Sequence, residues 1–393
     1  MSIMETEKTE EKQMKKLEIK GNVGEAIIYT VSDEKVAVDD YAVAQIKMLC
    51  DNEVSRNSKI RVMPDVHPSK VSTVGLTMAV GDRILPSLVG IDIGCGVTMV
   101  KLEKFRPEYQ KIDSIILENI STEKGVRKKN YPKAEKFDFN KLEVSNHINK
   151  KRALQSLGTL GFGNHYLEID VDNNKNYYLT VHSGSRSLGK EVAEYYLAEG
   201  QKILKSRNEI IPYELTYLTG DLKSAYLQDL QAVQEYALLN RQIMLEEICK
   251  SMKWKFSEIF NCTHNYVDFS GSQAILRKGA ISAQKDELVL IPVNMRDGVI
   301  IGRGKGNEDW NYSAPHGAGR ILKRTEVKNQ HTLSEFKTSM KGIYSSTISK
   351  ETLDESPFAY RGLEDITEAI TETVEIEKIL RPVYNFKAGS IKE

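Results

Sequence analysis

Five residues of this sequence have the chemistry of metal ligands and stand in glycine-rich or tightly turning stretches. In VGIDIGCGV, Asp92 lies three residues before Cys95, and glycine flanks the cysteine on both sides. GFGNHYLEI, VHSGSR and CTHNYV contribute His165, His182 and His264. One carboxylate, one thiolate and three imidazoles suit a transition-metal ion such as zinc, manganese or iron, and a thiolate can bridge two ions. Each residue alone is more often structural, and it is their conjunction that indicates a metal centre.

A second candidate site surrounds His316 in the stretch SAPHGAGR. Pro315 fixes the backbone that approaches the histidine, and Gly317 and Gly319 leave space beside its ring. Arg320 could hold an anion. A histidine in this setting is a candidate nucleophile or proton donor, and the alternative is a structural histidine in a turn.

Basic residues near glycines form three candidate anion sites. SGSRSLG precedes an expected helix and contains Arg186, so helix amides and a guanidinium could bind a phosphate together. RKGA adds Arg277 and Lys278. GRGKGN at 302–307 is glycine-rich and basic, but it matches no phosphate-loop motif. A solvated turn is the alternative for the last two stretches.

Composition limits the classes of protein to consider. Lys plus Arg equals Asp plus Glu at 55 each, so the overall charge gives no support for a nonspecific polyanion binder. The four cysteines are scattered and form no CxxC pair, so we expect reduced thiols. No apolar run reaches spanning length, and the first residues are too polar for a signal peptide. We therefore expect a soluble cytoplasmic protein.

The elements that position these residues follow from hydrophobic periodicity. Residues 1–16 are charged and are expected to be a flexible N-terminal segment, with residues 17–393 forming a single domain. Short β-rich runs are EAIIYTV, KIRVMPDV, TVGLTMAV, VGIDIGCGVTMVKL, NYYLTVHSGS, ISAQKDELVLIPVNM and GVIIGRG. Helical spacing marks residues 112–120, 187–204, 221–255 and the acidic stretch 362–380. This mixture predicts an α/β fold of mixed α+β type.

Seven motifs resemble those of one family and occur in the same order. MPDVH, DIGCG, GNHYLEI, HSGSR, HN, SAPHGAGR and a C-terminal lysine segment are similar to the motifs of RtcB-type RNA-splicing ligases, from about residue 20 onward. The resemblance implies a single large domain with a central metal and nucleotide cleft. It also implies an enzyme that joins an RNA 3′-phosphate, or a 2′,3′-cyclic phosphate, to an RNA 5′-hydroxyl, using GTP and manganese.

The resemblance assigns a role to each candidate ligand and to the histidine of SAPHGAGR. Two Mn²⁺ ions would be held, with Cys95 bridging them, by Asp92, Cys95, His165, His182 and His264. His316 would attack the α-phosphorus of GTP and become guanylylated. Asp65, in MPDVH, would orient His316 by accepting its other ring proton.

A wider set of residues would bind GTP and RNA, again by resemblance. Glu168 would accept from the guanine N1 and amino hydrogens, and Lys387 would donate to the guanine carbonyl. The full GTP set is Asn164, His165, Tyr166, Leu167, Glu168, His264, Asn265, Pro292, Val293, Asn294, Met295, His316, Gly317, Ala318, Gly319 and Lys387. The candidate clamps for RNA phosphates are Arg186, Arg277, Lys278 and Arg320.

Two departures from the family pattern bear on activity. MPDVH is followed by PSK, where a glycine-lysine-glycine turn is usual, and PVNM stands where PGSM is usual, so Val293 brings a β-carbon into the nucleotide loop. They indicate a divergent paralogue, and its RNA could be broken tRNA or rRNA, in splicing or in repair. No membrane partner is expected, and the need for an activating protein is left open.

Two other functions compete with ligation. A metal-dependent RNA-end phosphodiesterase or hydrolase would keep the ions without forming a covalent guanylate. A catalytically silent RNA-end binder would need neither the five ligands nor His316.

Overall fold

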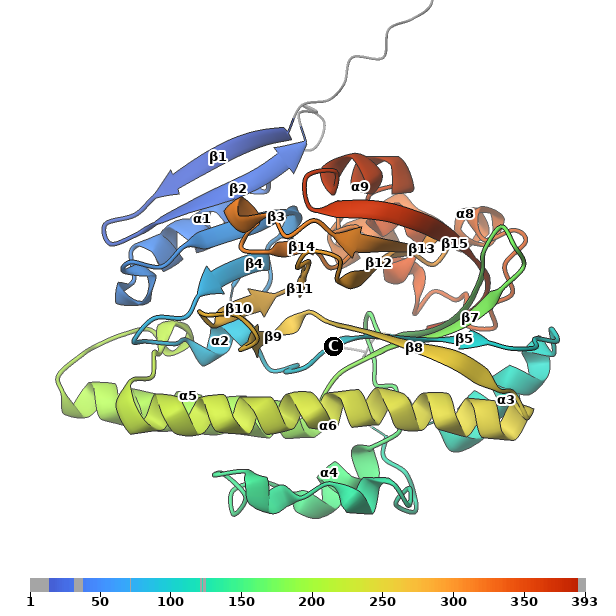
Figure 1. Cartoon of the computed structure of the whole chain (residues 1–393), viewed down its shortest axis with the longest axis horizontal. Helices are drawn as coiled ribbons and strands as arrows, with labels where there is room; N and C mark the ends of the chain where they lie inside the picture. Colours follow the sequence, from blue (N-terminus) through green and yellow to red (C-terminus); the bar gives the residue numbers. More distant parts are fainter. Residues whose placement is uncertain (1–13, 32–37, 71, 121, 123–124, 388–393) are drawn as a thin grey trace, which may run out of the picture.

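The computed structural model describes residues 14–31, 38–70, 72–120, 122 and 125–387. Two sheets lie side by side above a pair of long helices (Figure 1). A six-stranded sheet has the order β1-β2-β3-β4-β10-β9, and a seven-stranded sheet has the order β12-β13-β15-β6-β7-β5-β8. This architecture confirms the mixed α/β prediction.

The six-stranded sheet is antiparallel except for one pair of strands. Its strands are β1 (Met14–Lys20), β2 (Glu25–Val31), β3 (Ile60–His67), β4 (Val74–Ala79), β9 (Asn265–Asp268) and β10 (Ile275–Lys278). Strands β2 and β3 run parallel, because helix α1 (Asp40–Cys50) returns the chain to the same end of the sheet between them. Asp65 lies near the end of β3, where its carboxylate can reach a neighbouring layer.

The seven-stranded sheet is antiparallel throughout. Its strands are β5 (Gly96–Leu102), β6 (Tyr166–Val171), β7 (Tyr177–Ser183), β8 (Phe256–Thr263), β12 (Leu288–Asn294), β13 (Gly298–Gly304) and β15 (Val374–Lys387). A two-stranded ribbon of β11 (Ala280–Ser282) and β14 (Ser313–Pro315) lies between the two sheets (Figure 1).

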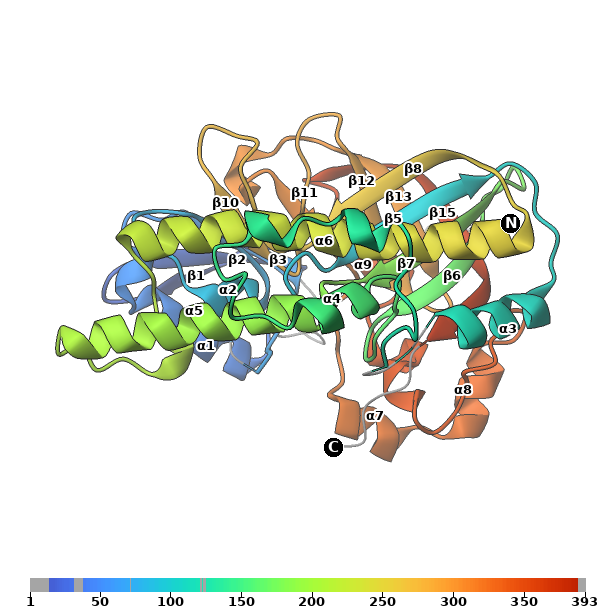
Figure 2. The same cartoon turned by 90° about the horizontal axis from the view of Figure 1, so that it is seen from below.

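Helix α6 (Gly220–Met252) runs beneath both sheets, α5 (Arg186–Ser206) lies beside it under the six-stranded sheet, and α4 (Lys150–Ser156) packs against α5 (Figure 2). The buried face of α6 contributes to two hydrophobic clusters, with Tyr236 in one and Met244 in the other. One helix therefore supports both sheets from below, and burial of this apolar face is the main source of its stability.

Shorter helices complete the structure. They are α2 (Pro86–Val89), α3 (Tyr109–Asn119), α7 (Arg324–Gln330), α8 (Leu333–Ser339) and α9 (Leu363–Ala369). Figure 1 shows α8 and α9 on the side of the seven-stranded sheet that faces away from α6. No helix in the described part of the chain combines the length and the apolar character needed to cross a bilayer.

Two element predictions differ from the structure. The acidic stretch 362–380 is helical only in α9, and from Val374 it forms β15, because Val374 and the residues after it pair with β13 and β6. β1 begins at Met14, so the last three residues of the expected N-terminal segment belong to a strand, and residues 1–13 lie outside the described residues. The long helix over 221–255 and the seven β-rich runs are confirmed, although Cys95 precedes its strand.

Candidate metal centre and active site

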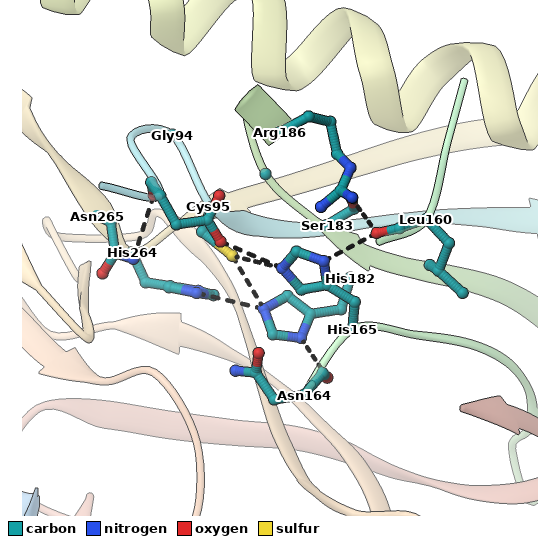
Figure 3. A network of polar contacts seen from close by, with 12 residues as sticks. Gly94, Cys95, Leu160, Asn164, His165, His182, Ser183, Arg186, His264 and Asn265 are labelled. Carbon is teal, nitrogen blue, oxygen red and sulfur yellow. Dashed lines mark hydrogen bonds and ion pairs between the residues drawn. The ribbon is translucent and has the colours of Figure 1, made fainter. Parts of the chain in front are cut away.

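Cys95 lies among the predicted imidazole ligands in a buried cluster (Figure 3). Its Sγ is 3.5 Å from His165 Nε2 and 3.4 Å from His182 Nε2. His182 Nε2 in turn lies 3.3 Å from His264 Nε2. Asp92 Oδ2 joins the cluster at 3.2 Å from His165 Nε2. The fold thus brings all five predicted ligands together from β5, β6, β7, β8 and the turns beside them.

The tautomers of two imidazoles show what the cluster can bind. His165 Nδ1 donates to the Leu160 carbonyl at 2.8 Å, and His182 Nδ1 donates to the Asn164 carbonyl at 3.1 Å. The Nε2 lone pair of His182 therefore points at the Cys95 thiol, and His165 Nε2 lies between that thiol and the Asp92 carboxylate. Convergent lone pairs in a buried space repel unless a cation lies between them, so the donor set fits a metal ion. Cys95, His165 and His182 have ligand atoms that all lie within 4.8 Å of one another.

Glycines explain how the thiolate and the carboxylate enter one cluster. Gly94 has φ +73° and packs against Ala237 and the backbone of α6, where a β-carbon would collide. Gly184, in HSGSR, lies against the Asp92 carboxylate, and a β-carbon there would overlap it. These two glycines let the loop before β5 and the turn after β7 approach each other.

Two polar residues of α6 hold these loops. The guanidinium of the fully buried Arg241 donates to the carbonyls of Gly94 and Ser183 at 2.7 and 2.8 Å. Asn240 accepts from the Gly158 amide at 2.7 Å and donates to the Gly184 carbonyl at 3.0 Å. Sequence reasoning missed both residues, and the available signal was an Asn-Arg pair within an apolar helical stretch.

The pKa values of the carboxylate and the thiol in this cluster shift in opposite directions. Burial raises the pKa of Asp92, but the hydrogen bond and charge of His165 outweigh it and the net pKa falls well below the usual range. Burial and the neighbouring Asp92 charge raise the pKa of the Cys95 thiol far above its usual value. A bound cation would lower the pKa of the Cys95 thiol, because metal ligation requires the thiolate.

His316, which directly follows β14, lies beside this candidate metal cluster. Its Nδ1 lies 2.7 Å from the fully buried Asp65 Oδ2, and its ring centroid is 4.8 Å from that of His264. Gly319 has φ +71°, and a β-carbon there would lie 2.6 Å from the Asp65 carbonyl oxygen, so glycine permits this close packing. Asp65 therefore accepts a hydrogen bond from Nδ1–H of His316, which leaves the lone pair of the ring on Nε2.

A cavity of about 260 Å³ joins His316 to the cluster. His182 and His264 line it on the metal side, while Glu168 and Lys387 line it farther away. Thirteen of the residues predicted for GTP line this cavity: Asn164, Tyr166, Glu168, His264, Pro292, Val293, Asn294, Met295, His316, Gly317, Ala318, Gly319 and Lys387. Sequence reasoning missed His67, Arg324, Tyr360 and Asn385 among the lining residues.

Three residues predicted for GTP do not line the cavity. Leu167 faces the hydrophobic core, because side chains alternate along β6 and its neighbours Tyr166 and Glu168 take the cavity side. Asn265 instead bonds the Asp92 carbonyl at 3.3 Å and the Gly279 amide at 3.0 Å. The side chain of His165 is directed to the metal cluster.

The predicted phosphate clamps occupy different settings. Arg277 is fully buried and bound to Asp268, Tyr266 and Ser313, so its guanidinium already has partners within the protein. Lys278 is half-buried, and its Nζ donates to Ser72 Oγ at 2.8 Å, away from the cavity.

Arg186 and Arg320 lie nearer the site. Arg186 begins α5 with φ +56°, a strained value for a non-glycine residue. Burial lowers the pKa of its guanidinium, and the nearby Asp92 charge partly opposes this shift. The Arg320 guanidinium lines the cavity, but it bonds the Leu322 and Asp354 carbonyls, Glu355 and Tyr360. Its donors are therefore largely occupied by the protein.

A buried carboxylate gathers the cations of the cavity. Glu355 is 1% exposed and lies 3.1 Å from Lys387 Nζ, 2.6 Å from Arg324 Nη1 and 3.3 Å from Arg320 Nη1. Burial raises the pKa of Glu355, but Lys387 and the two arginines outweigh it and the net pKa falls below the usual range. The carboxylate thus stays charged and holds three cations along one wall of the cavity.

The PVNM segment accommodates the β-carbon that Val293 brings to this wall of the cavity. Val293 lies in β12, is 4% exposed and joins a hydrophobic cluster, with a register shift between Pro292 and Asn294. The Asn294 side chain accepts from the amides of Arg296 and Asp297, both at 3.0 Å. A bulge and an asparagine-capped turn form this wall without a positive φ at Val293.

Comparison with known proteins agrees with the arrangement of these residues. The family model described as tRNA-splicing ligase RtcB matches residues 52–141 and 114–388. The RNA-splicing ligase RtcB of Escherichia coli strain K12 is 30% identical over 362 residues, covering 82% of this chain and 88% of that protein.

Two further relatives extend the match. The RNA-splicing ligase RtcB2 of Escherichia coli strain ATCC 25922 is 24% identical over 93% of this chain and 97% of its own length. The tRNA-splicing ligase RtcB of Aeropyrum pernix is 26% identical over 89% of this chain and 92% of its own length. Together, the match to the family model over most of the sequence and these similarities show that the chain belongs to the tRNA-splicing ligase RtcB family.

Proposed function

We propose that this protein is a GTP- and manganese-dependent RNA ligase that joins RNA 3′-phosphate or 2′,3′-cyclic phosphate ends to 5′-hydroxyl ends. The observation that carries the proposal is His316, which is bonded to the buried Asp65 and lines the same cavity as His182 and His264 of the candidate metal cluster. The relatives named RNA-splicing ligases support RNA as the substrate.

The residues of this chain divide the chemistry among them. Asp92, Cys95, His165, His182 and His264 would hold Mn²⁺, which supplies charge stabilisation for the transferring phosphoryl groups. In the first step His316 Nε2 attacks the α-phosphorus of GTP, the bond from this phosphorus to the bridging oxygen breaks, and pyrophosphate leaves. Asp65 stabilises the positive charge that develops on the imidazole during this attack.

Three further steps complete the ligation of a cyclic phosphate end. A cyclic phosphate end is first opened by water to a 3′-phosphate. One oxygen of that phosphate attacks the guanylyl phosphorus, and the bond to His316 breaks. The 5′-hydroxyl of the second RNA then attacks the activated 3′-phosphorus, the new phosphodiester forms, and GMP leaves.

Selection of guanine is assigned to the far end of the cavity. Glu168 is 2% exposed, and its Oε2 accepts from Asn385 Nδ2 at 2.5 Å, so its carboxyl is held in one orientation. Lys387 lies on the same wall, with Nζ 5.6 Å from the Tyr166 ring centroid. An acceptor and a donor at these positions match guanine and leave buried polar groups unpaired with adenine.

The experiment that tests this function is covalent labelling. Purified protein is incubated with α-labelled GTP and Mn²⁺ and separated on a denaturing gel, beside His316→Ala, Cys95→Ala and the control His147→Ala at an exposed histidine. Label in the parent and in the control, and none in the other two variants, is the expected result. Bound metal without label in the parent would reject the guanylylation chemistry and favour the hydrolase.

A further inference from the structure

The metal cluster has two sides. His182 and His264 line the nucleotide cavity, whereas the side chain of Asp92 is 34% exposed and does not line it. Two apolar residues stand beside this outer side: Ile91, adjacent to Asp92 and 54% exposed, and Phe162, three residues before His165 and 38% exposed. A substrate that reaches the ions from outside the cavity would pass these residues.

The backbone places Phe162 at this position. Gly161 has φ +95° and Gly163 has φ +77°, so the loop turns on both sides of the phenylalanine. Gly161 also lacks the β-carbon that would collide with the Arg186 guanidinium. The Arg186 Cζ consequently lies 5.9 Å from the Phe162 ring centroid. On the other side, a β-carbon at Gly163 would lie 3.9 Å from Arg324 Nη2.

Phe162 belongs to none of the hydrophobic clusters of the described structure. Its ring is therefore not retained for core packing, and partial exposure of an aromatic side chain costs free energy that a bound ligand would recover. Aromatic rings stack with any nucleobase, and an adjacent guanidinium adds attraction to the base and to its phosphate. The ring and the Arg186 guanidinium beside it together match an unpaired nucleotide.

We propose that Phe162 is a stacking platform for a nucleobase at the RNA end that reacts, with Arg186 beside its phosphate. The base would lie on the outer side of the metal cluster, and the terminal phosphate would point past Asp92 toward the ions. This inference rests on the proposed function for its choice of RNA, and it adds a base subsite that is separate from the guanine end of the cavity.

Fluorescence of a modified RNA tests the platform. A short single-stranded RNA carries 2-aminopurine as its last nucleotide and a 3′-phosphate, and it is titrated with the protein in Mn²⁺ without GTP. Stacking on Phe162 quenches the 2-aminopurine. We expect quenching with the parent, with Phe162→Trp and with the control Tyr213→Ala, which removes an exposed aromatic residue on the α5–α6 connection.

Loss of the ring has a defined result. In Phe162→Ala and Phe162→Leu the quenching disappears and RNA affinity falls about tenfold, because leucine keeps apolar volume but has no π-face. Quenching that persists in both variants, or is absent from the parent, overturns the proposal. Covalent labelling by GTP in the same parent preparation reports the proposed function separately, since the titration contains no nucleotide.

Discussion

Two groups of polar side chains in this protein illustrate opposite solutions to burial. Around Cys95, imidazole nitrogens and a thiol face one another within 3.3–3.5 Å, beside the Asp92 carboxylate. Around Glu355, three cations meet a carboxylate, at 2.6–3.3 Å. In the first group the partner that would satisfy the lone pairs must come from outside. In the second group the protein holds both signs of charge.

This comparison distinguishes polar residues that are suited to bind a ligand from polar residues that are paired within the protein. Arg277 belongs to the second kind, although a basic residue near glycine suggested a phosphate clamp. Whether a charged group already has its partner inside the protein is the observation that distinguishes them, and the following variants test it at each group.

The largest effect is expected from Cys95→Ser. The substitution keeps nearly the same volume but removes the soft ligand at the centre of the cluster. We expect bound manganese, measured by mass spectrometry of the metal after dialysis, to fall sharply, and covalent labelling to drop about 10³-fold or more. The control Cys249→Ser changes a buried cysteine of α6 and should keep its metal. Equal metal content in the two variants would remove Cys95 from the ligand set.

Asp65→Asn should come next. The asparagine amide can donate to His316 Nδ1, which favours the wrong tautomer of the nucleophile. We expect the rate of labelling by GTP to fall about 10²–10⁴-fold while the metal content stays at the level of the parent. A rate within threefold of the parent would show that Asp65 does not set the state of His316.

Arg277→Met tests the structural assignment directly. It leaves the Asp268 carboxylate, 13% exposed, without its 2.6 Å partner. We therefore expect the free energy of unfolding to fall by about 3–5 kcal/mol. Urea denaturation followed by circular dichroism measures the change. Arg56→Met, at an exposed ion pair with Glu53, should show no measurable change. Stability equal to that of the parent would restore Arg277 as a candidate clamp.

Glu355→Gln removes one charge from the wall of the cavity. Burial lowers the pKa of Lys387, but the charge of Glu355 outweighs it, so the net pKa is raised in the parent and should fall in the variant. We expect the KM for GTP in the labelling assay to rise about tenfold, because the three cations then repel one another. Glu247→Gln, which breaks the 2.9 Å pair with Arg127, is the matched control. An equal KM in both variants would reduce Glu355 to a structural role.

The smallest effect is a pH dependence of GTP affinity. Burial raises the pKa of Glu168 to about 7, so its carboxylate is partly protonated near neutral pH. Because only the carboxylate accepts two hydrogen bonds from guanine, affinity should increase severalfold as the pH rises through about 7. Isothermal titration with GTP from pH 6 to pH 8.5 measures this. Glu168→Gln should flatten the profile, and a profile unchanged in that variant would assign the titration to another group.

Much of the site could be predicted because its residues lie in local patterns. Asp92 and Cys95 share one turn, and His316 stands in its own glycine-rich stretch, so each motif fixes its own geometry. The residues that sequence reasoning missed act over long separations. Arg241 lies 147 residues from the Gly94 carbonyl that it binds, and Glu355 gathers cations from other segments.

The fold was predictable to a similar limit. Short β-rich runs of apolar residues predicted β2 and β13, and helical spacing predicted α6. The sequence pattern predicts that the helix continues through residues 374–380, because acidic residues between apolar ones suit either a helix or a strand. Their strand conformation is stabilised by pairing with β13, whose partner residues lie 70 or more positions earlier in the chain.

The position of β15 has a consequence for biosynthesis. This strand lies between β13 and β6, and it carries Lys387 at its end. During translation, β6 and β13 emerge first and acquire their common neighbour only when residues 374–387 leave the ribosome. The seven-stranded sheet and the wall that contains Lys387 are therefore completed late. The candidate metal ligands, which lie in or beside β5, β6, β7 and β8, are all translated before the strand that carries Lys387.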